Sequence, residues 1–294
     1  MRPQMYLRQR FRDGGITSGN AQRRFEKLRL LHWPASELVR CFKLDAQKAS
    51  QMIVEHGGYP GAVPLLHEPL RWSAYLRDSI IEPAIGRDLL AVQPVRKPAL
   101  LRQLFAIATG HPSEILSLQK ICGVLQSAGA INTVADYLHL LEEACLVVGL
   151  MKHSGRMVRQ RSAPPKLVVL NNALLSAQRM DGLPSVNAIP ELWGRWLENA
   201  CLAFAWNAGQ QVFYWREEPL EVDGVLQGSW GQWAIEIKGG AYGIADLHGI
   251  LEFCRRNKDF RPLVICQKGL ENIARSANVD AVSWAEFLLQ GPPQ

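Results

Sequence analysis

The stretch that decides the fold of the second half of the chain is Glu221-Val-Asp-Gly-Val-Leu-Gln-Gly-Ser-Trp-Gly-Gln-Trp-Ala-Ile-Glu-Ile-Lys238. Two short apolar runs flank its central segment Gly228-Ser-Trp-Gly231, which has a glycine at each end. This pattern predicts a β-hairpin with a short loop. A hairpin that is symmetric about the loop places Asp223 directly opposite Glu236.

Charged side chains gather on one face of this predicted hairpin. Because side chains alternate along a strand, Glu236 and Lys238 share a face, whereas Ile235 and Ile237 point to the other. Opposed residues have Cβ atoms about 4.5–5.5 Å apart, so the carboxylates of Asp223 and Glu236 repel each other. A divalent cation between them removes that repulsion. The pattern therefore predicts a metal site on Asp223 and Glu236, with a half-exposed cluster of ion pairs as the alternative.

The residues on either side extend the hairpin into an α/β domain. Upstream, large apolar residues recur at helical spacing over residues 192–204, and a strand follows at 212–215. Downstream, a helical pattern near 245–256 precedes a buried strand at 262–266. The order helix, three strands, helix, strand predicts one α/β domain over residues 191–294.

A further carboxylate lies in the upstream helix. Glu198 sits at the edge of the apolar stripe of that helix. Carboxylates in nearly buried positions are rare unless they are paired. We therefore expect Glu198 to be either a functional acid or a member of an ion pair.

The middle of the chain has a different pattern. Three helical patterns and two strand-like runs follow one another, over residues 99–109, 117–126, 133–144, 146–151 and 166–170. Three helices and a β-hairpin are the parts of a winged helix-turn-helix. We predict such a domain over residues 96–170, and a winged helix that serves only for packing is the alternative to one that binds DNA.

The positive charge of this predicted domain lies in its wing. The third helix carries Asp136, Glu142 and Glu143, so we do not expect that helix to read bases. The basic residues of the wing are Lys152, Arg156, Arg159, Arg161 and Lys166. We expect these side chains to contact DNA phosphates with little dependence on base sequence.

The chain begins with a basic segment. The net charge is +6, and residues 1–40 contain nine Lys and Arg against three Asp and Glu, so this segment carries the whole excess. A basic arm attracts nucleic acid, although solvated tails are often basic without a partner. Residues 1–95 are predicted to form this arm and a helical, lid-like segment in which Pro83 kinks or breaks a helix. Residues 171–190 contain glycine and two prolines and are expected to be a linker.

The composition favours a reduced, cytoplasmic protein without membrane contact. The six cysteines are dispersed and form no CxxC pair, which favours buried thiols over a disulfide framework or a zinc site. No apolar run reaches the roughly 18 residues that cross a bilayer, and the N-terminal residues lack the apolar segment of a signal peptide.

Glu198 on a helix, Asp223 on a strand and Glu236-x-Lys238 on the next strand together resemble the PD-(D/E)xK restriction-endonuclease-like superfamily. The resemblance implies a phosphodiesterase that depends on Mg²⁺ (or Mn²⁺). Asp223 and Glu236 would hold the metal ion, and Lys238 would orient the attacking water or neutralise charge at phosphorus. Glu198 would complete the metal shell or hold Lys238 in place.

A wider resemblance covers residues from about 30 to 290. The segments that carry it are Gly57-Gly-Tyr-Pro-Gly61, Tyr75-Leu-Arg-Asp78, Ile80-Ile-Glu82, Arg87-Asp88, Tyr137-Leu-His-Leu-Leu-Glu142, Pro165-Lys166 and Val222-Asp-Gly224. They are similar to the part of a prokaryotic AAA-type ATPase family that follows the ATPase core, where a winged helix is joined to a nuclease-like domain. Asn171 stands where that family is expected to have an aspartate.

The chain contains no Gly-x-x-x-x-Gly-Lys-[Ser/Thr] segment, so no ATP site is expected in it. The ATPase core is then either truncated from this chain or encoded separately. We expect a DNA-associated, Mg²⁺-dependent, nuclease-like protein. The alternatives are a non-catalytic DNA- or protein-binding subunit that docks on a separate ATPase or a cognate protein, and a folded relic without activity.

Overall fold

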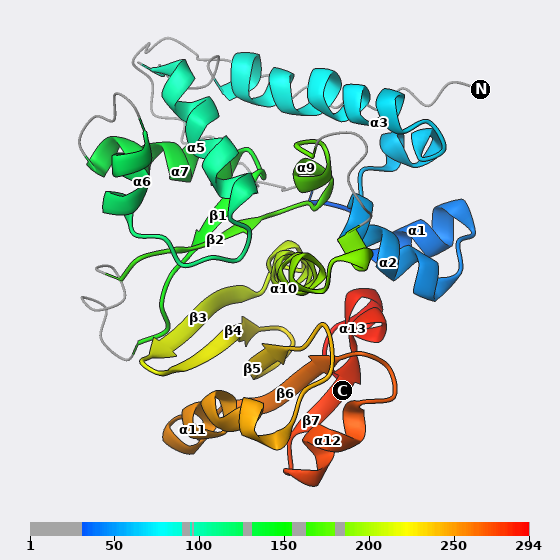
Figure 1. Cartoon of the computed structure of the whole chain (residues 1–294), viewed down its shortest axis with the longest axis vertical. Helices are drawn as coiled ribbons and strands as arrows, with labels where there is room; N and C mark the ends of the chain where they lie inside the picture. The colour runs from blue at the N-terminus through cyan, green and yellow to red at the C-terminus, as the bar shows by residue number, and fades with distance from the viewer. Residues whose placement is uncertain are drawn as a thin grey trace, which may run out of the picture.

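The computed structural model describes residues 31–89, 95, 97–125, 131–154, 163–179 and 186–293. Within them, a helical N-terminal half contains a small two-stranded sheet, and a C-terminal half is built on a five-stranded mixed sheet (Figure 1). The predicted class is therefore confirmed: an α/β protein with a helical N-terminal region, three helices with a hairpin in the middle, and an α/β unit at the end.

Helices make up the first described segment. They are α1 (Ala35–Phe42), α2 (Ala46–His56), the 3-10 turn η1 (Pro60–Leu65), α3 (Pro69–Leu76) and the π-helical turns η2 (Arg77–Ile81) and η3 (Ala84–Asp88). Asp45 caps α2, because its carboxylate accepts hydrogen bonds from the N–H groups of Gln47 and Lys48. Pro83 lies between the two π-helical turns. A proline cannot donate an i to i−4 bond, and the chain passes it in widened turns without leaving the helical path.

The three helices and the hairpin of the middle segment lie where the pattern predicts them. They are α5 (Pro98–Gly110), α6 (Leu118–Val124), α7 (Ile131–Glu143), β1 (Val147–Leu150) and β2 (Lys166–Val169). The two strands pair antiparallel, from Val147 opposite Val169 to Leu150 opposite Lys166. Residues 155–162, at the tip of this wing, lie outside the described residues.

The connection between the two halves is more ordered than the expected linker. Asn171 and Asn172 are buried, and the chain turns at once into the short helix α9 (Ala173–Ser176). Residues 180–185 of the expected linker lie outside the described part. After the turn η4 (Val186–Ala188), the chain enters α10 (Pro190–Asn207), which lies between the N-terminal half and the large sheet (Figure 1). The composition of residues 171–179 was therefore a poor guide, because their amides are buried by tertiary hydrogen bonds.

The large sheet has the strand order β3-β4-β5-β6-β7. Its strands are β3 (Gln211–Glu217), β4 (Leu220–Gly228), β5 (Gly231–Ile237), β6 (Arg261–Cys266) and β7 (Asp280–Ser283). The first three strands are antiparallel, whereas β5, β6 and β7 run parallel. The predicted hairpin register is confirmed from the turn, where Gly228 pairs with Gly231, to Gly224 opposite Ile235. The ladder ends there, one position before Asp223 and Glu236.

Helices cover both faces of this sheet. One face packs against α10 and α13 (Trp284–Gln290), and the other against η5 (Ile244–Leu247), α11 (His248–Arg256) and α12 (Glu271–Ser276). Gly224 allows α10 to approach β4, because a Cβ atom at that position would lie 2.7 Å from Leu202 and 2.8 Å from Ile235. Ile235 and Ile237 belong to the core on the α10 side, which leaves Glu236 on the other side of the strand.

The wing joins the free edge of β3. The Tyr214 N–H donates to the Met151 carbonyl (3.2 Å), and the Tyr214 carbonyl accepts from the His153 N–H (2.6 Å). The Tyr214 hydroxyl also donates to the Pro164 carbonyl. The imidazole of His153 packs edge-on against Phe253, with ring centroids 5.4 Å apart. Main-chain and aromatic contacts therefore connect the winged-helix half with the C-terminal half.

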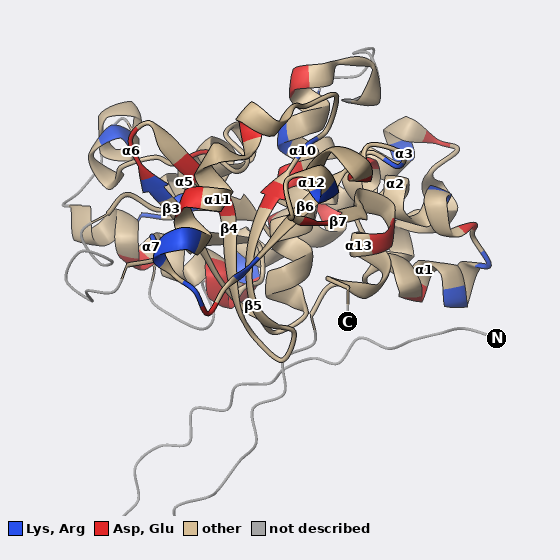
Figure 2. Ribbon diagram, turned by 90° about the horizontal axis from the view of Figure 1, so that it is seen from below, with Lys and Arg blue, Asp and Glu red and all other residues tan. Residues whose placement is uncertain are grey.

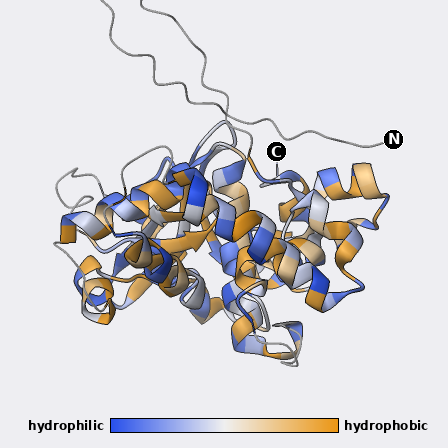
Figure 3. Cartoon of the chain, turned by 90° about the horizontal axis from the view of Figure 1, so that it is seen from above, coloured by the Kyte–Doolittle hydropathy of each residue, from blue (hydrophilic) through white to orange (hydrophobic). Residues whose placement is uncertain are grey.

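The described helices mix hydrophobic and hydrophilic residues along their length (Figure 3). This is the pattern of helices that pack one face on a core and turn the other to solvent. Among the described residues, no helix combines the length and the apolar character that crossing a membrane requires.

Candidate functional site

Charged side chains from four strands and helices meet where the wing, α10 and the β4–β5 hairpin come together. We call this group the acidic cluster; its members are Lys166 on β2, Glu198 on α10, Glu221 and Asp223 on β4, Glu236 on β5 and Lys238 directly after β5. The sequence predicted that Glu198, Asp223, Glu236 and Lys238 would lie together, and the fold brings these four into one neighbourhood.

The hairpin part of the cluster has the geometry that the register implies. Asp223 reaches across to β5, where its Oδ2 accepts a hydrogen bond of 2.8 Å from the Ile237 N–H. The Lys238 ammonium donates to Glu236 Oε1 at 2.8 Å. The Asp223 side chain therefore takes the place of the next backbone hydrogen bond between β4 and β5. Its carboxylate stays beside that of Glu236.

Lys166 is the member of the cluster that the sequence placed wrongly. Its side chain is only 1% exposed, so it cannot serve as the surface phosphate contact that we expected of a basic wing residue. Its Nζ lies 2.5 Å from Glu198 Oε1, 3.4 Å from Glu221 Oε1 and 3.8 Å from Asp223 Oδ1. It also donates to the Asp223 carbonyl at 3.2 Å. Lys166 is the first residue of β2. Its side chain extends toward α10 and β4, where the carboxylates of Glu198, Glu221 and Asp223 surround its ammonium.

The role of Glu198 changes with that of Lys166. Two alternatives followed from the sequence, a functional acid and an ion-pair member, and the resemblance added that Glu198 would complete the metal shell or hold Lys238. In the structure, Glu198 pairs with Lys166, and Lys238 pairs with Glu236. The winged-helix half thus supplies the counter-charge of Glu198.

The pKa values of the cluster are set first by burial and then by the neighbouring charges. Burial raises the pKa of Glu236 to about 8, and the neighbouring Asp223 charge adds to the rise while Lys238 opposes it. Burial likewise raises the pKa of Glu198 to about 7, against the lowering effect of Lys166. Burial by itself would lower the pKa of Lys166, but Glu198, Asp223 and Glu221 raise it above its ordinary value. Lys166 therefore stays charged, whereas the carboxyl groups of Glu198 and Glu236 are protonated more easily than in water.

One oxygen of the cluster has no hydrogen-bond partner among the described residues. Glu236 Oε2 is buried and accepts no hydrogen bond from any described residue, an arrangement that is costly for a carboxylate. Within the described part of the chain, no three His, Cys, Asp or Glu side chains are grouped so that they could hold a metal ion together. A cation here would rest on Asp223 and Glu236 alone, and Mg²⁺ is commonly held by one or two carboxylates and water.

Most of the residues expected to contact DNA lie outside the described residues. Arg156, Arg159 and Arg161 belong to the undescribed tip of the wing. Lys152 is described, and it forms a backbone bridge with Tyr214 at the edge of the large sheet. Lys, Arg, Asp and Glu are interspersed over the ribbon, and no described helix is uniformly basic (Figure 2). Phosphate contact by the wing stays a prediction.

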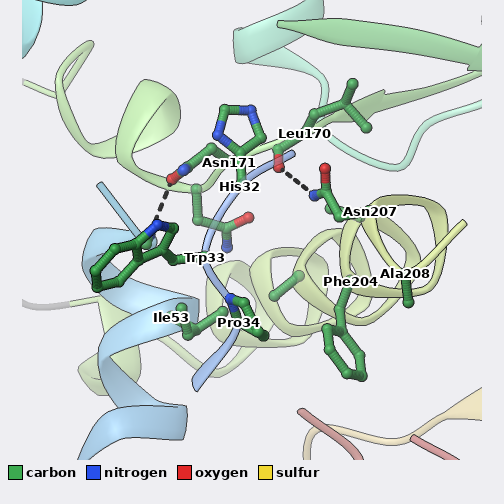
Figure 4. A pocket seen from close by; sticks show the side chains of 14 residues that line it. His32, Trp33, Pro34, Ile53, Leu170, Asn171, Phe204, Asn207 and Ala208 are labelled. Atoms are coloured by element: carbon green, nitrogen blue, oxygen red, sulfur yellow. Dashed lines mark hydrogen bonds between the residues drawn. The ribbon is translucent and has the colours of Figure 1, made fainter. Parts of the chain in front are cut away.

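A second polar region surrounds a cavity of about 100 Å³ between the residues before α1, the end of α2, α9 and α10. Trp33, from the residues before α1, lies across the cavity from Phe204 and Asn207 of α10, and Asn171, from the residues before α9, also lines it (Figure 4). Asn171 Oδ1 accepts hydrogen bonds from the N–H groups of Gly58 and Ala173. The asparagine at this position therefore holds a turn of the chain in place, which is a structural use of a position where the resemblance led us to expect an aspartate.

Three further amides, at this cavity or next to it, make neutral hydrogen bonds. Asn199 Oδ1 accepts from the Val169 N–H at 2.9 Å, and its Nδ2 donates to the Val169 carbonyl at 2.7 Å and to Asn172 Oδ1 at 2.8 Å. Asn207 donates to the Leu170 carbonyl at 3.0 Å. We call Asn171, Asn172, Asn199 and Asn207 the amide network. The sequence did not single it out, because isolated asparagines have no pattern that distinguishes a buried amide from an exposed one.

Two family models match the chain. Residues 47–184 match a family described as "Domain of unknown function (DUF8612)", and residues 193–287 match one described as "Domain of unknown function (DUF4143)". The first match spans the N-terminal helices and the winged helix, and the second spans the unit that contains the large sheet. Neither description names an activity.

A search of curated proteins found no match. Among solved structures, the crystal structure of protein VC1899 from Vibrio cholerae is similar with 12% identity and a TM-score of 0.26. The alignment covers 83% of this chain and 58% of that protein, so this chain spans little more than half of its length. A TM-score this low carries no argument about the fold.

Proposed function

We propose that this chain is a DNA-associated, cytoplasmic protein with a Mg²⁺-dependent phosphodiesterase site of the PD-(D/E)xK type. The observation that carries the proposal is the pair of carboxylates on the hairpin. Asp223 and Glu236 lie side by side, Lys238 is hydrogen-bonded to Glu236, and one buried oxygen of Glu236 accepts no hydrogen bond from the described residues. The pKa of Glu236, raised to about 8, agrees with a carboxylate that lacks a cation.

The residues of this site would divide the work as follows. Asp223 and Glu236 would hold the metal ion, which when bound supplies a Lewis acid for the phosphodiester. The Lys238 ammonium keeps Glu236 in place and would neutralise charge on the phosphate with its remaining N–H groups. Glu198 does not reach the metal in this arrangement, since it is committed to Lys166.

The proposed partner is DNA, bound through the basic wing and the basic N-terminal arm. Both segments carry clustered Lys and Arg in the sequence, and such clusters bind phosphates with strong dependence on salt. The resemblance to the tail of an AAA-type ATPase family, together with the missing P-loop, leads us to propose a separate ATPase as a second partner.

A non-catalytic subunit that binds DNA or another protein is the second candidate. One observation favours it: the buried ammonium of Lys166 already neutralises part of the charge of Glu198 and Asp223. An acidic cluster with a built-in cation can be kept for the connection between two structural units, without any reaction.

The test is cleavage of plasmid and single-stranded DNA by the full chain, with Mg²⁺ or Mn²⁺ against EDTA. We expect metal-dependent nicking that Asp223→Asn and Glu236→Gln each reduce by a factor of 100 or more, on the order of 3 kcal/mol of barrier. Glu252→Gln is a matched control, because Glu252 is an α11 carboxylate that pairs with Arg255 and Arg256, away from the cluster.

Two other results would decide against cleavage. Salt-dependent DNA binding without any metal-dependent nicking would establish the second candidate. If the chain neither binds nor cleaves DNA, the proposed function is wrong, and of the second candidate only a subunit that binds another protein is left.

A further inference from the structure

We propose that the Lys166 ammonium occupies the position that a second divalent ion would take in the acidic cluster. The cluster then binds one divalent ion, at Asp223 and Glu236, and not two. This inference rests on the proposed function and assigns a role in it to a residue of the winged-helix half. Lys166 acts through Glu198 and Asp223 and is therefore a positioning residue.

The surroundings of the Lys166 ammonium are those of a cation site. Four oxygen atoms from three residues lie within 4 Å of Nζ: Glu198 Oε1 at 2.5 Å, the Asp223 carbonyl at 3.2 Å, Glu221 Oε1 at 3.4 Å and Asp223 Oδ1 at 3.8 Å. Carboxylates and main-chain carbonyls are also the ligands that hard divalent cations take in proteins. In this chain the ammonium of a lysine side chain that is 1% exposed occupies the position.

Asp223 connects this position with the proposed metal site. Its carboxylate faces the Lys166 ammonium through Oδ1 and reaches the β5 backbone through Oδ2, beside Glu236. Two-metal phosphodiester sites place two divalent ions about 3.5–4 Å apart. A fixed ammonium next to Asp223 would repel a second divalent ion strongly in a buried site, so only one such ion is accommodated.

The position of Lys166 is set by contacts close to it in the chain. The Tyr214 hydroxyl binds the Pro164 carbonyl on one side, and Asn199 binds both backbone groups of Val169 on the other. The strand that carries Lys166 is thus anchored on the C-terminal half at both ends. The backbone on both sides of Lys166 therefore places its ammonium.

The test is Mn²⁺ binding to the full chain by isothermal titration calorimetry. Lys166→Met keeps the length of the side chain and removes its charge. We expect one bound Mn²⁺ for the wild type and two for Lys166→Met, with the first ion bound at least about tenfold more tightly because a neighbouring positive charge is gone. Lys120→Met, which changes an exposed lysine of α6 in the same half, should titrate like the wild type.

The outcomes separate this inference from the proposed function. A Lys166→Met protein that binds the same number of ions with the same affinity as the wild type overturns the inference and leaves the proposed function standing. If the wild type binds no ion and Lys166→Met binds one, the metal-dependent site is wrong, while the assignment of Lys166 to a cation position holds.

A measurement on the wild type covers the case in which Lys166→Met does not fold. A protein labelled with ¹⁵N-lysine should show a slowly exchanging ammonium signal for the buried Lys166. We expect Mg²⁺ to shift this signal and leave it present, because ion and ammonium are neighbours. Loss of the signal on addition of Mg²⁺ would mean that the ion displaces Lys166, and an unchanged signal would mean that no ion binds beside it; either result overturns the inference.

Discussion

Two polar interiors meet on neighbouring residues of α10, and they differ in charge. Asn199 faces the amide network, where its three hydrogen bonds of 2.7–2.9 Å use both of its side-chain polar atoms. Glu198, one residue earlier, faces the acidic cluster, where four buried or partly buried carboxylates share two lysines. The amide network is neutral and Asn199 is fully hydrogen-bonded in it, whereas Asn171 Nδ2 and Asn207 Oδ1 are buried without a hydrogen-bond partner among the described residues. The acidic cluster, in contrast, holds more carboxylates than lysines.

This difference separates an interior that serves the fold from the one at which we propose a metal site. A buried amide whose partners are all present stabilises the structure at little electrostatic cost. Buried charges cost several kcal/mol each unless they are well compensated, and an uncompensated excess lowers stability without improving the packing. The amide network therefore holds the two halves together, and the acidic cluster is the place where a cation would be gained.

The largest effect should come from the neutral side. Asn199→Ala leaves the Val169 N–H, the Val169 carbonyl and Asn172 Oδ1 without their partner in a site with no exposed surface. Each such group costs about 1–3 kcal/mol, so we expect a loss of about 3–5 kcal/mol in the free energy of unfolding. Urea denaturation measures it. Asn207→Ala, which removes one bond to Leu170, should cost only about 1 kcal/mol. Equal losses for both variants would contradict the larger role assigned to Asn199.

The neutral interior should also respond to acid. Burial lowers the pKa of His32, whose ring is hydrogen-bonded to the Cys145 carbonyl, below its ordinary value of 6.5. The unfolded chain therefore binds a proton that the folded chain refuses, and stability is lost as the pH falls below about 6.5, by up to about 1.4 kcal/mol per pH unit for this group. His32→Gln should flatten the pH dependence between pH 6.5 and 5.5 by that amount in urea denaturation. A steeper dependence in the variant would show that His32 is protonated in the folded protein.

On the charged side, removal of a carboxylate should do the opposite of removal of an amide. Asp223→Asn keeps the shape of the side chain and relieves the repulsion with Glu236, so the metal-free protein should be equally stable or more stable by about 1 kcal/mol. The same variant should lose the rise in melting temperature that millimolar Mg²⁺ gives the wild type. A loss of several kcal/mol, with no effect of Mg²⁺ on the wild type, would make the cluster a structural set of ion pairs.

The smallest effect should come from Lys238. Its ammonium is partly exposed and pairs with Glu236, and such pairs contribute up to about 1 kcal/mol. Lys238→Ala should lower the stability of the metal-free protein slightly, because Glu236 loses its counter-charge. Differential scanning calorimetry without metal gives the sign, and a rise in melting temperature would contradict the pairing.

The sequence predicted the parts of this comparison that depend on local patterns. The hairpin register follows from a turn with a glycine at each end and from the alternation of Glu236 and Lys238 with isoleucines. The three helices and the wing strands follow from hydrophobic spacing. Both signals come from neighbours along the chain, where periodicity and turn chemistry decide the structure.

The parts that the sequence did not predict depend on distant partners. A lysine at the start of a wing strand is expected to be exposed, because the burial of an unpaired ammonium costs too much free energy. No local feature of the sequence shows that Glu198 and Asp223 lie beside it in the fold. Pro165-Lys166 was among the segments that carried the family resemblance, which was the one available sign of a special role. Asn171 and Asn172 were taken for a linker for the same reason, since their partners on α2 and α10 are far away in sequence.

The contact of the wing with Tyr214 has a consequence for expression of the C-terminal half alone. A polypeptide that starts at α10 would uncover the outer side of β3, where the backbone groups of Tyr214 now bind Met151 and His153. Bare strand edges invite pairing between molecules, so such a fragment should self-associate into oligomers or aggregates. It would also lack Lys166, whose ammonium lies beside the carboxylates of Glu198 and Asp223. A shortened protein that contains the large sheet therefore has to include the segment around residues 151–170.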